Sequence, residues 1–288
     1  MNIFVTGATG WVGSAVVDDL LTEGHQVIGL VRSRQKVTEL EAMGAGSLQG
    51  TLDDLDTLSQ AAASADAVIH TAFHHDFSRF LESAAQDARA IEVMGAALEG
   101  TQKPLIVTTG LSGLPRGATE ADLPNPAAPR RSEAAARALI ERGVRVGIVR
   151  LAPSVHGIGD HGFIPAVIGF ARRTGVSAWV GEGDNHWSGI HRLDAARVYR
   201  LALEKGLPET VYHAVADESV PFPEIAEVIG RHLGLPTESR PAEHFGGFAN
   251  MVGGEMAASS AKTRAVLGWT PTGPGLLEDL EQPAYYAS

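Results

Sequence analysis

Three glycines, each three residues from the next, are the feature of this sequence with the clearest chemical use. Gly7, Gly10 and Gly13 follow an apolar run at residues 2–6. The first glycine permits a sharp turn off a strand, the second lets a pyrophosphate approach the backbone, and the third lets a helix pack close to the sheet. The free N–H groups and positive dipole end of that helix then bind the phosphates. The sequence therefore predicts a dinucleotide site at Gly7, Thr9, Gly10, Trp11, Val12 and Gly13.

The cations after the second apolar run, residues 26–31, bear on which dinucleotide is bound. Arg32, Ser33 and Arg34 stand where an NAD-binding chain carries a carboxylate for the ribose 2′-hydroxyl, and no Asp or Glu occurs between residues 25 and 38. A guanidinium makes charge-assisted hydrogen bonds to phosphate. Arg32 and Ser33 are therefore predicted to bind the 2′-phosphate of NADP. NAD is the alternative cofactor, in which case these cations are only solvated surface groups.

Histidine side chains are the best candidates for moving a proton, and the chain contains eleven. A carbonyl that accepts a hydride needs a proton for its developing alkoxide, from a side chain or from water. Several histidines follow expected strands, and open α/β sheets bind ligands at the carboxyl ends of their strands. The run His74-His75-Asp76 lacks the helical spacing of a metal-ligand pair, so no metal is predicted. The residues predicted to contact substrate are His74, His75, His156, Trp187 and His191, with loop anchoring as the alternative for Trp187.

These side chains must be positioned by elements that alternate along the first 150 residues. Short apolar runs are typical of buried parallel strands, and amphipathic stretches of about ten residues are typical of the helices between them. The alternation predicts an α/β fold with a doubly wound parallel sheet. Strands are expected at residues 2–6, 26–31, 47–49, 67–70, 105–108, 144–149 and 210–215, and helices at 12–23, 37–43, 55–63, 77–98, 132–142, 194–203, 223–233 and 262–267.

The composition of the sequence changes after residue 150. Loops over an active face are expected at residues 152–160 and 181–189, and a further loop at 246–254. We expect residues 1–155 to form a dinucleotide-binding Rossmann domain, to which 190–215 return. Residues 156–189 and 216–288 are expected to form a smaller substrate-binding lobe.

Composition excludes several classes of function. The 288 residues carry a formal net charge of −11, which disfavours nucleic acid and anionic membranes as partners. The absence of cysteine excludes disulfides, thiolate catalysis and cysteine-bound metal. No signal peptide and no span of about 20 apolar residues is found, so a cytoplasmic protein is expected. The expected partner is a small-molecule substrate, with a homodimer left open.

Residues 5–13 resemble the cofactor loop of extended and atypical short-chain dehydrogenases/reductases. Three further segments, residues 66–72, 150–157 and 267–271, are similar to other parts of that family in the same order. The resemblance implies that the segment after the expected strand at 144–149 lies beside the nicotinamide. It also implies cofactor contacts from Leu52, Thr71, Ala72, Phe73, Thr108, Thr109, Pro153, Ser154 and Val155.

The sequence departs from that family at the usual acid pair, Tyr-x-x-x-Lys. Pro129 stands at the tyrosine position and Glu133 at the lysine position, and none of the four tyrosines has a lysine four residues later. The usual catalytic serine could be replaced only by Thr109 or Ser112. His156, which the resemblance places near the nicotinamide, is the first choice for a general acid or a substrate-orienting group.

Three functions are compatible with these features. The first is an NADP-dependent reductase of a small or medium carbonyl, imine or related acceptor that works without the Tyr–Lys pair. The second is a non-catalytic NADP-binding sensor, which the loss of that pair favours. The third is a nucleotide-sugar epimerase or dehydratase, for which the acidic chain offers few cations, Arg172 and Arg173 among them.

Overall fold

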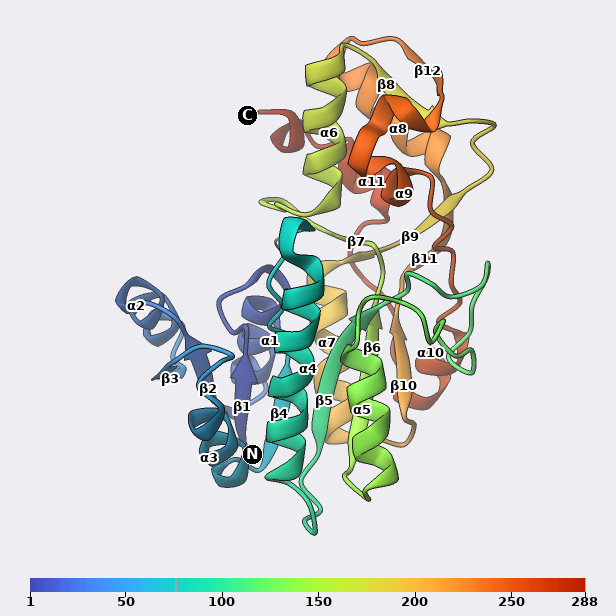
Figure 1. Cartoon of the computed structure of the whole chain (residues 1–288). Helices are drawn as coiled ribbons and strands as arrows, with labels where there is room; N and C mark the ends of the chain where they lie inside the picture. Colours follow the sequence, from blue (N-terminus) through green and yellow to red (C-terminus); the bar gives the residue numbers. More distant parts are fainter. Residues whose placement is uncertain (76, 288) are drawn as a thin grey trace.

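The computed structural model of the protein describes residues 1–75 and 77–287. Its main feature is a seven-stranded sheet in the order β10-β6-β5-β4-β1-β2-β3, and every neighbouring pair is parallel (Figure 1). The predicted α/β fold with a doubly wound Rossmann sheet is therefore confirmed. The strands are β1 Asn2–Thr6, β2 Gln26–Val31, β3 Gly46–Gln49, β4 Ala67–His70, β5 Leu105–Gly110, β6 Val146–Leu151 and β10 Val211–Ala214.

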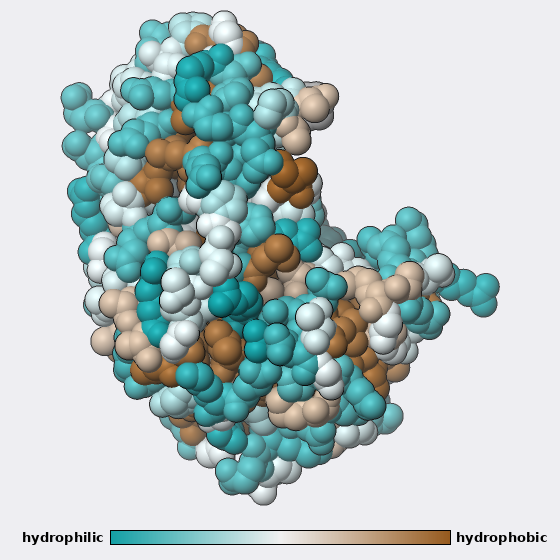
Figure 2. Space-filling model, turned by 180° about the vertical axis from the view of Figure 1, so that it is seen from behind, coloured by the Kyte–Doolittle hydropathy of each residue, from teal (hydrophilic) through white to brown (hydrophobic). Residues whose placement is uncertain are grey.

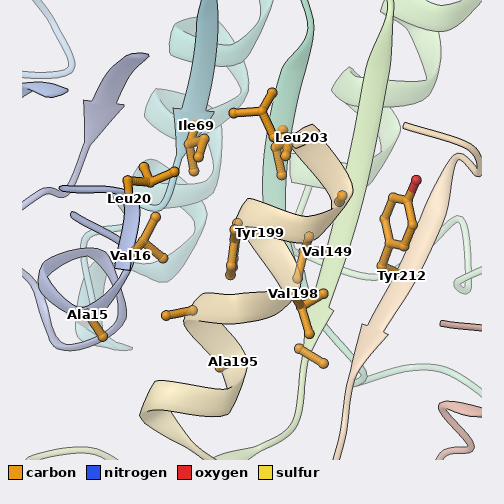
Figure 3. Packing of buried hydrophobic residues seen from close by; sticks show 14 of the residues in the cluster. Ala15, Val16, Leu20, Ile69, Val149, Ala195, Val198, Tyr199, Leu203 and Tyr212 are labelled. Carbon is orange, nitrogen blue, oxygen red and sulfur yellow. The ribbon is translucent and has the colours of Figure 1, made fainter. Parts of the chain in front are cut away.

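Helices cover both faces of this sheet, because each strand presents apolar side chains on both sides. In Figure 1, α4 and α5 lie in front of the sheet, and α1 and α7 lie behind it. Figure 3 shows how Val16 and Leu20 of α1 and Val198 and Tyr199 of α7 pack together over the strands, next to Ile69 of β4. The helices are α1 Trp11–Thr22, α2 Arg34–Ala42, α3 Leu55–Ser64, α4 Phe80–Ala96, α5 Ser132–Glu141 and α7 Arg192–Glu204, with a 3₁₀ turn η1 at Phe77–Arg79.

The strand order reverses direction between β1 and β4. The crossover after β1 leads to β2 and β3 on one side, and the chain then returns to place β4 on the other side of β1. In open parallel sheets, ligands bind in the crevice beyond the carboxyl ends of the strands at such a switch point. In Figure 1 these carboxyl ends point toward the smaller, upper part of the molecule.

That upper part forms a lobe with its own apolar core, centred on Trp187, Phe222 and Ile225. It contains a three-stranded sheet in the order β11-β9-β7 and the parallel pair β12-β8. The helix α10 Ala261–Leu267 lies outside the lobe and packs near β10 and α7. The elements of the lobe are β7 Ser154–His156, α6 Phe163–Thr174, β8 Ser177–Val180, β9 His186–His191, β11 Asp217–Pro221, α8 Phe222–Leu233, β12 Thr237–Arg240, η2 Ala242–Phe248, α9 Ala249–Val252, α11 Leu276–Leu280 and η3 Pro283–Tyr286.

The three segments expected to be loops are partly regular structure. Residues 152–160 contain β7, residues 181–189 contain the start of β9, and residues 246–254 contain the end of η2 and all of α9. The expectation of plain loops was wrong there, because the strands β7 and β9 pair with each other and β9 pairs with β11, and these partners come from distant parts of the sequence. Within the described residues, no helix is both long enough and apolar enough to cross a membrane.

Candidate functional site

The three glycines form a tight loop between β1 and α1. Gly7 has a φ of +69°, which a side chain would disfavour, and its carbonyl oxygen accepts a hydrogen bond of 2.8 Å from the N–H of Gly10. A Cβ on Gly13 would lie 2.1 Å from that same carbonyl oxygen, so only glycine fits there. Gly10 precedes α1 without a side-chain cap, which leaves the first N–H groups of the helix available to an anion.

The end of β4 packs against this loop. The Thr71 hydroxyl donates to the carbonyl oxygen of Thr6 at 2.8 Å, and the Ala72 N–H donates to the Thr6 hydroxyl at 3.4 Å. A Cβ on Gly7 would lie 2.7 Å from the Ala72 nitrogen, so the two strand ends are in close contact. The structure therefore brings the predicted residues Thr71 and Ala72 to the phosphate loop.

Trp11 connects the same loop to the segment after β6. Its indole Nε1–H donates to the carbonyl oxygen of Val155 at 2.6 Å. The guanidinium carbon of Arg192 lies 4.1 Å from the centre of a Trp11 ring, within the range of a cation–π contact, and Arg192 also donates to Ser14 at 3.1 Å. The His161 ring meets Trp11 edge-on at 5.7 Å. The predicted cofactor residues at both ends of this bridge thus lie side by side.

Exposed cations follow β2. Arg32 is exposed, and among the described residues its guanidinium has no hydrogen-bond or ion-pair partner. The Ser33 hydroxyl caps α2 by accepting from the Lys36 N–H at 3.4 Å, and Lys36 itself pairs with Glu39 at 2.5 Å. Leu52 is half-buried and packs against the apolar layer under α3. The guanidinium of Arg32 is therefore exposed and unpaired within the described residues.

The molecular surface has an indentation beside the edge of the sheet that carries α2 and β3 (Figure 2). Seen from the side opposite to Figure 1, it is indented between the lobe and the edge that carries α2 and β3 (Figure 2). In Figure 1 the carboxyl ends of β1 and β2 point to the same region. The indentation therefore lies on the side to which the carboxyl ends of β1 and β2 point.

The candidates at the end of β5 have different surroundings. Thr108 is buried, and its hydroxyl shares a hydrogen bond of 2.9 Å with the Tyr199 hydroxyl inside the sheet–helix layer. Thr109 is also buried, at 6% exposure, whereas Ser112 is exposed in the following loop. Pro153 is half-buried and Ser154 is buried in β7. The side chain of Thr108 therefore faces a helix rather than the open edge.

Arg130 is a site residue that the sequence analysis did not select. It precedes α5, its Nε–H donates to the Ser132 hydroxyl at 3.0 Å, and its Nη2 donates to the carbonyl oxygen of Thr108 at 3.3 Å. Its guanidinium carbon lies 4.3 Å from the centre of the Phe73 ring, which follows β4. No local spacing signals this position, because the contacts come from two other strand ends.

A buried chain of hydrogen bonds runs from the phosphate loop to Arg130. The Thr6 hydroxyl bonds His70 Nδ1 at 2.7 Å, and His70 Nε2 bonds Asp87 Oδ1 at 2.9 Å. The Ser132 hydroxyl donates to Asp87 Oδ2 at 2.6 Å and accepts from Arg130. Burial lowers the pKa of Arg130, and the negative charge of Asp87 opposes that shift.

The predicted histidines lie in two places: His74 and His75 follow β4, whereas the rings of His156 and His191 lie 5.8 Å apart in the lobe. His74 and His75 are exposed after β4, and His75 meets Phe73 edge-on at 5.2 Å. Desolvation lowers the pKa of His75, and the positive charge of Arg130 lowers it further. His191 is half-buried at the end of β9, where desolvation lowers its pKa and Nδ1 has no hydrogen-bond partner.

His156 is fully buried in the lobe rather than open to the crevice. Its Nδ1–H donates to Asp279 Oδ2 at 2.8 Å, and Asp279 also accepts from the Tyr285 hydroxyl at 2.5 Å. Trp187 is also buried, with its ring 5.0 Å from that of Phe222. His156 and Trp187 are therefore not placed for direct contact with a substrate, because neither side chain is accessible in this structure.

Glu133, which the resemblance aligns with the lysine of the usual acid pair, is held in buried ion pairs. Glu133 is buried and accepts hydrogen bonds from Arg150 at 2.9 and 2.7 Å and from Arg137 at 2.7 Å. Burial raises the pKa of Glu133, but the bonds from Arg150 and Arg137 outweigh it and hold the pKa below its usual value.

Within residues 1–75 and 77–287 no group of three metal-ligating side chains converges, and Asp76 lies outside the described residues.

A glycine-rich turn between β1 and α1, at the switch point of a parallel sheet, defines a dinucleotide-binding Rossmann protein. A family model described as NAD(P)H-binding matches residues 7–156. The chain belongs to this NAD(P)H-binding family, and the resemblance to short-chain dehydrogenases/reductases is confirmed.

Similar proteins extend the likeness over nearly the whole chain. An uncharacterized protein of Schizosaccharomyces pombe is 46% identical over an alignment of 295 positions, which covers 99% of this chain and 100% of that protein. A 2-alkyl-3-oxoalkanoate reductase of Stenotrophomonas maltophilia is 28% identical over an alignment of 260 positions, which covers 82% of this chain and 77% of the reductase. The solved UDP-glucose 4-epimerase of Thermotoga maritima has a TM-score of 0.77 at 20% identity, covering 99% of this chain and 98% of that one, which shows a shared fold.

Proposed function

We propose that the protein is an NADP(H)-dependent reductase of a small or medium carbonyl, imine or related acceptor. The observation that supports this most is the unpaired guanidinium of Arg32 at the end of β2, where an NAD-binding chain carries a carboxylate. The relative from Stenotrophomonas maltophilia is named as a reductase of oxoalkanoates, a carbonyl class. In the proposed complex the dinucleotide supplies the hydride when it is bound.

The protein's own residues have separate tasks in this proposal. The N–H groups at the start of α1, together with Gly10, bind the pyrophosphate, and Arg32 binds the 2′-phosphate. The segment at Pro153 and Val155 borders the nicotinamide end, where the bond from Trp11 holds it. The candidates for contact with the acceptor are Thr109, Ser112, His74, His75 and His191.

The sensor alternative is favoured by one observation. Glu133 is fixed between Arg137 and Arg150, so it cannot do the work of the lysine that lowers the tyrosine pKa in the family. The nucleotide-sugar alternative has less support, since Arg172 donates to the carbonyl oxygen of Tyr286 and Arg173 lies over the ring of Phe170 at 5.7 Å. Both cations are exposed on α6, and each has a partner within the lobe.

The test is a titration of the purified protein with NADPH and with NADH, followed by turnover assays. We expect NADPH to bind at least tenfold tighter, and Arg32→Ala to remove most of that preference, since a hydrogen bond to a charged group contributes about 1.5–3 kcal/mol. Lys262→Ala, which removes an exposed cation on α10, is the matched control. Equal affinities that Arg32→Ala leaves unchanged would refute the cofactor assignment. Tight binding without turnover of ketones, imines, quinones or enones would favour the sensor.

A further inference from the structure

The Arg130 guanidinium is fixed on three sides and open on a fourth. Its Nε–H and Nη2 groups are bonded to Ser132 and to the Thr108 carbonyl, and its face covers the Phe73 ring. Its Nη1 has no hydrogen-bond partner among the described residues. Nη1 is not fully enclosed, and Arg130 as a whole is half-buried. A guanidinium held in this way presents its free N–H donors in one direction.

A network of buried polar side chains supports the half-buried guanidinium of Arg130. Ser132 and Asp87 are buried at 0% and 1% exposure, and they join Arg130 through His70 to Thr6, the last residue of β1. The buried carboxylate of Asp87 keeps a counter-charge next to the guanidinium. Side chains locked by such a network hold a functional group in place with little loss of entropy on binding.

Arg130 lies where a fixed positive charge could contact a bound ligand. It lies at the carboxyl edge of the sheet between the ends of β4 and β5, next to Pro129, which stands where the family carries its tyrosine. That edge is the half of the crevice beside the segment at Val155. His75 lies close enough for the charge of Arg130 to lower its pKa. Arg130 therefore adds a positive charge to this edge of the sheet.

We propose that Arg130 binds an anionic oxygen of the hydride acceptor, and this proposal rests on the proposed reductase function. A hydride passes from the dihydronicotinamide to the carbonyl carbon, and the electron pair of the C=O π bond moves to the oxygen. The dinucleotide is oxidised and the carbonyl is reduced. The Nη1 donors of Arg130 stabilise the alkoxide, which then takes a proton from water, because an arginine side chain stays protonated in proteins and does not give up its own. A carboxylate on the acceptor would be bound by the same donors.

The first experiment measures anion binding without turnover. Acetate and benzoate are titrated by calorimetry into the protein with and without NADPH, comparing the wild type with Arg130→Gln and Arg130→Lys. We expect saturable binding in the wild type, at least a tenfold loss in Arg130→Gln and a smaller loss in Arg130→Lys. Arg131→Gln, an exposed neighbour, is the control. No saturable binding in the wild type, or equal binding in Arg130→Gln, overturns the proposal.

The second experiment separates this proposal from the reductase itself. With an acceptor that is turned over, Arg130→Gln should lower kcat by about 10²–10³ while leaving NADPH affinity unchanged, the effect of removing one oxyanion donor. The kcat of the wild type should stay level from pH 8 to 10, where a tyrosine acid would titrate. Anion binding that needs Arg130, without turnover of any acceptor, refutes the reductase but keeps the anion site. Turnover that Arg130→Gln leaves unchanged refutes Arg130.

Ser132 is the positioning residue in this arrangement. Ser132→Ala removes the bond to Arg130 Nε and leaves one oxygen of Asp87 without its donor. We expect the acetate affinity of Ser132→Ala to fall less than that of Arg130→Gln. Added guanidinium ion should restore acetate binding in Arg130→Ala. It should not do so in Ser132→Ala, because the arginine still fills the site there. If Ser132→Ala only lowered the melting temperature and left acetate binding intact, the positioning role would be wrong.

Discussion

The indole Nε1–H of Trp11 donates a hydrogen bond of 2.6 Å to the backbone carbonyl oxygen of Val155, 144 residues further along the chain. This bond joins the start of α1 to β7, the strand that leads from the sheet into the lobe. The phosphate end and the nicotinamide end of the proposed cofactor site are therefore held at a fixed separation by one side chain. Arg192, which begins α7, covers the same indole.

Trp11→Phe should weaken NADPH binding several-fold and lower the free energy of unfolding by about 1–3 kcal/mol, because it leaves the Val155 carbonyl oxygen without its donor. Calorimetric titration and urea unfolding measure the two effects. Trp269→Phe is the matched control, since this buried indole has no partner for its N–H and also lies under an arginine, Arg264, at 5.5 Å. Equal NADPH affinities in the two variants would contradict a bridging role for Trp11.

Gly13→Ala should abolish dinucleotide binding and destabilise the protein. The new Cβ would lie 2.1 Å from the carbonyl oxygen of Gly7, a backbone atom that cannot move without opening the loop. Gly247→Ala is the control, because its Cβ meets nothing within 4 Å and its φ is not in the left-handed region. We expect the control to retain wild-type NADPH affinity. A Gly13→Ala protein that binds NADPH normally would show that the loop does not hold the pyrophosphate as proposed.

Most strands of the main sheet could be predicted from the sequence because each is a local apolar run that needs no partner to be recognised, whereas β3 has Leu48 as its one large apolar residue. β9 could not, since Ser188 and Gly189 resemble a loop and are buried only by pairing with β7 and β11. The same limit applies to single residues. His156 has the position expected of an active-site residue, but its partner Asp279 lies 123 residues later in the sequence.

Asp279 anchors the end of the chain to the segment beside the proposed nicotinamide site. It accepts from His156 and Tyr285, and the Tyr285 hydroxyl accepts from the Gly157 N–H at 2.7 Å. Asp279→Asn should lower the free energy of unfolding by about 1–3 kcal/mol, since a buried donor loses its acceptor. Tyr285→Phe, which removes only the hydroxyl, should cost less. Urea unfolding at pH 7 measures both, and an Asp279→Asn protein as stable as the wild type would contradict this anchoring role.

The effect of Asp279 should depend on pH in a definite direction. Burial raises the pKa of Asp279, but the hydrogen bonds from His156 and Tyr285 outweigh it and hold the pKa below its usual value of 3.8. A carboxyl with a depressed pKa adds stability above the unfolded-state value and loses it as the pH falls through the folded-state value. The difference between the wild type and Asp279→Asn should therefore be constant near pH 7 and narrow below about pH 4. Unfolding curves at pH 3 to 7 measure it, and a difference that widens in acid would contradict this direction.

Restoring the family's acid pair should fail at one of its two positions. Pro129 is exposed, so Pro129→Tyr should fold normally. Glu133→Lys should destabilise the protein by at least about 3–5 kcal/mol, the cost of leaving a buried charge without its partner. The reason is Arg150, which is fully buried and donates to both oxygens of Glu133 from β6, so a lysine would place a second cation beside it.

Glu133→Gln is the matched control for that reversal, because an amide keeps the shape and one acceptor and should cost about 1–3 kcal/mol. The double change Glu133→Lys with Arg150→Met removes the repulsion and should recover part of the loss. Thermal unfolding of the single and double variants measures this coupling. If Glu133→Lys alone were as stable as the wild type, the Glu133–Arg150 pair would not be what separates this site from the family's usual chemistry.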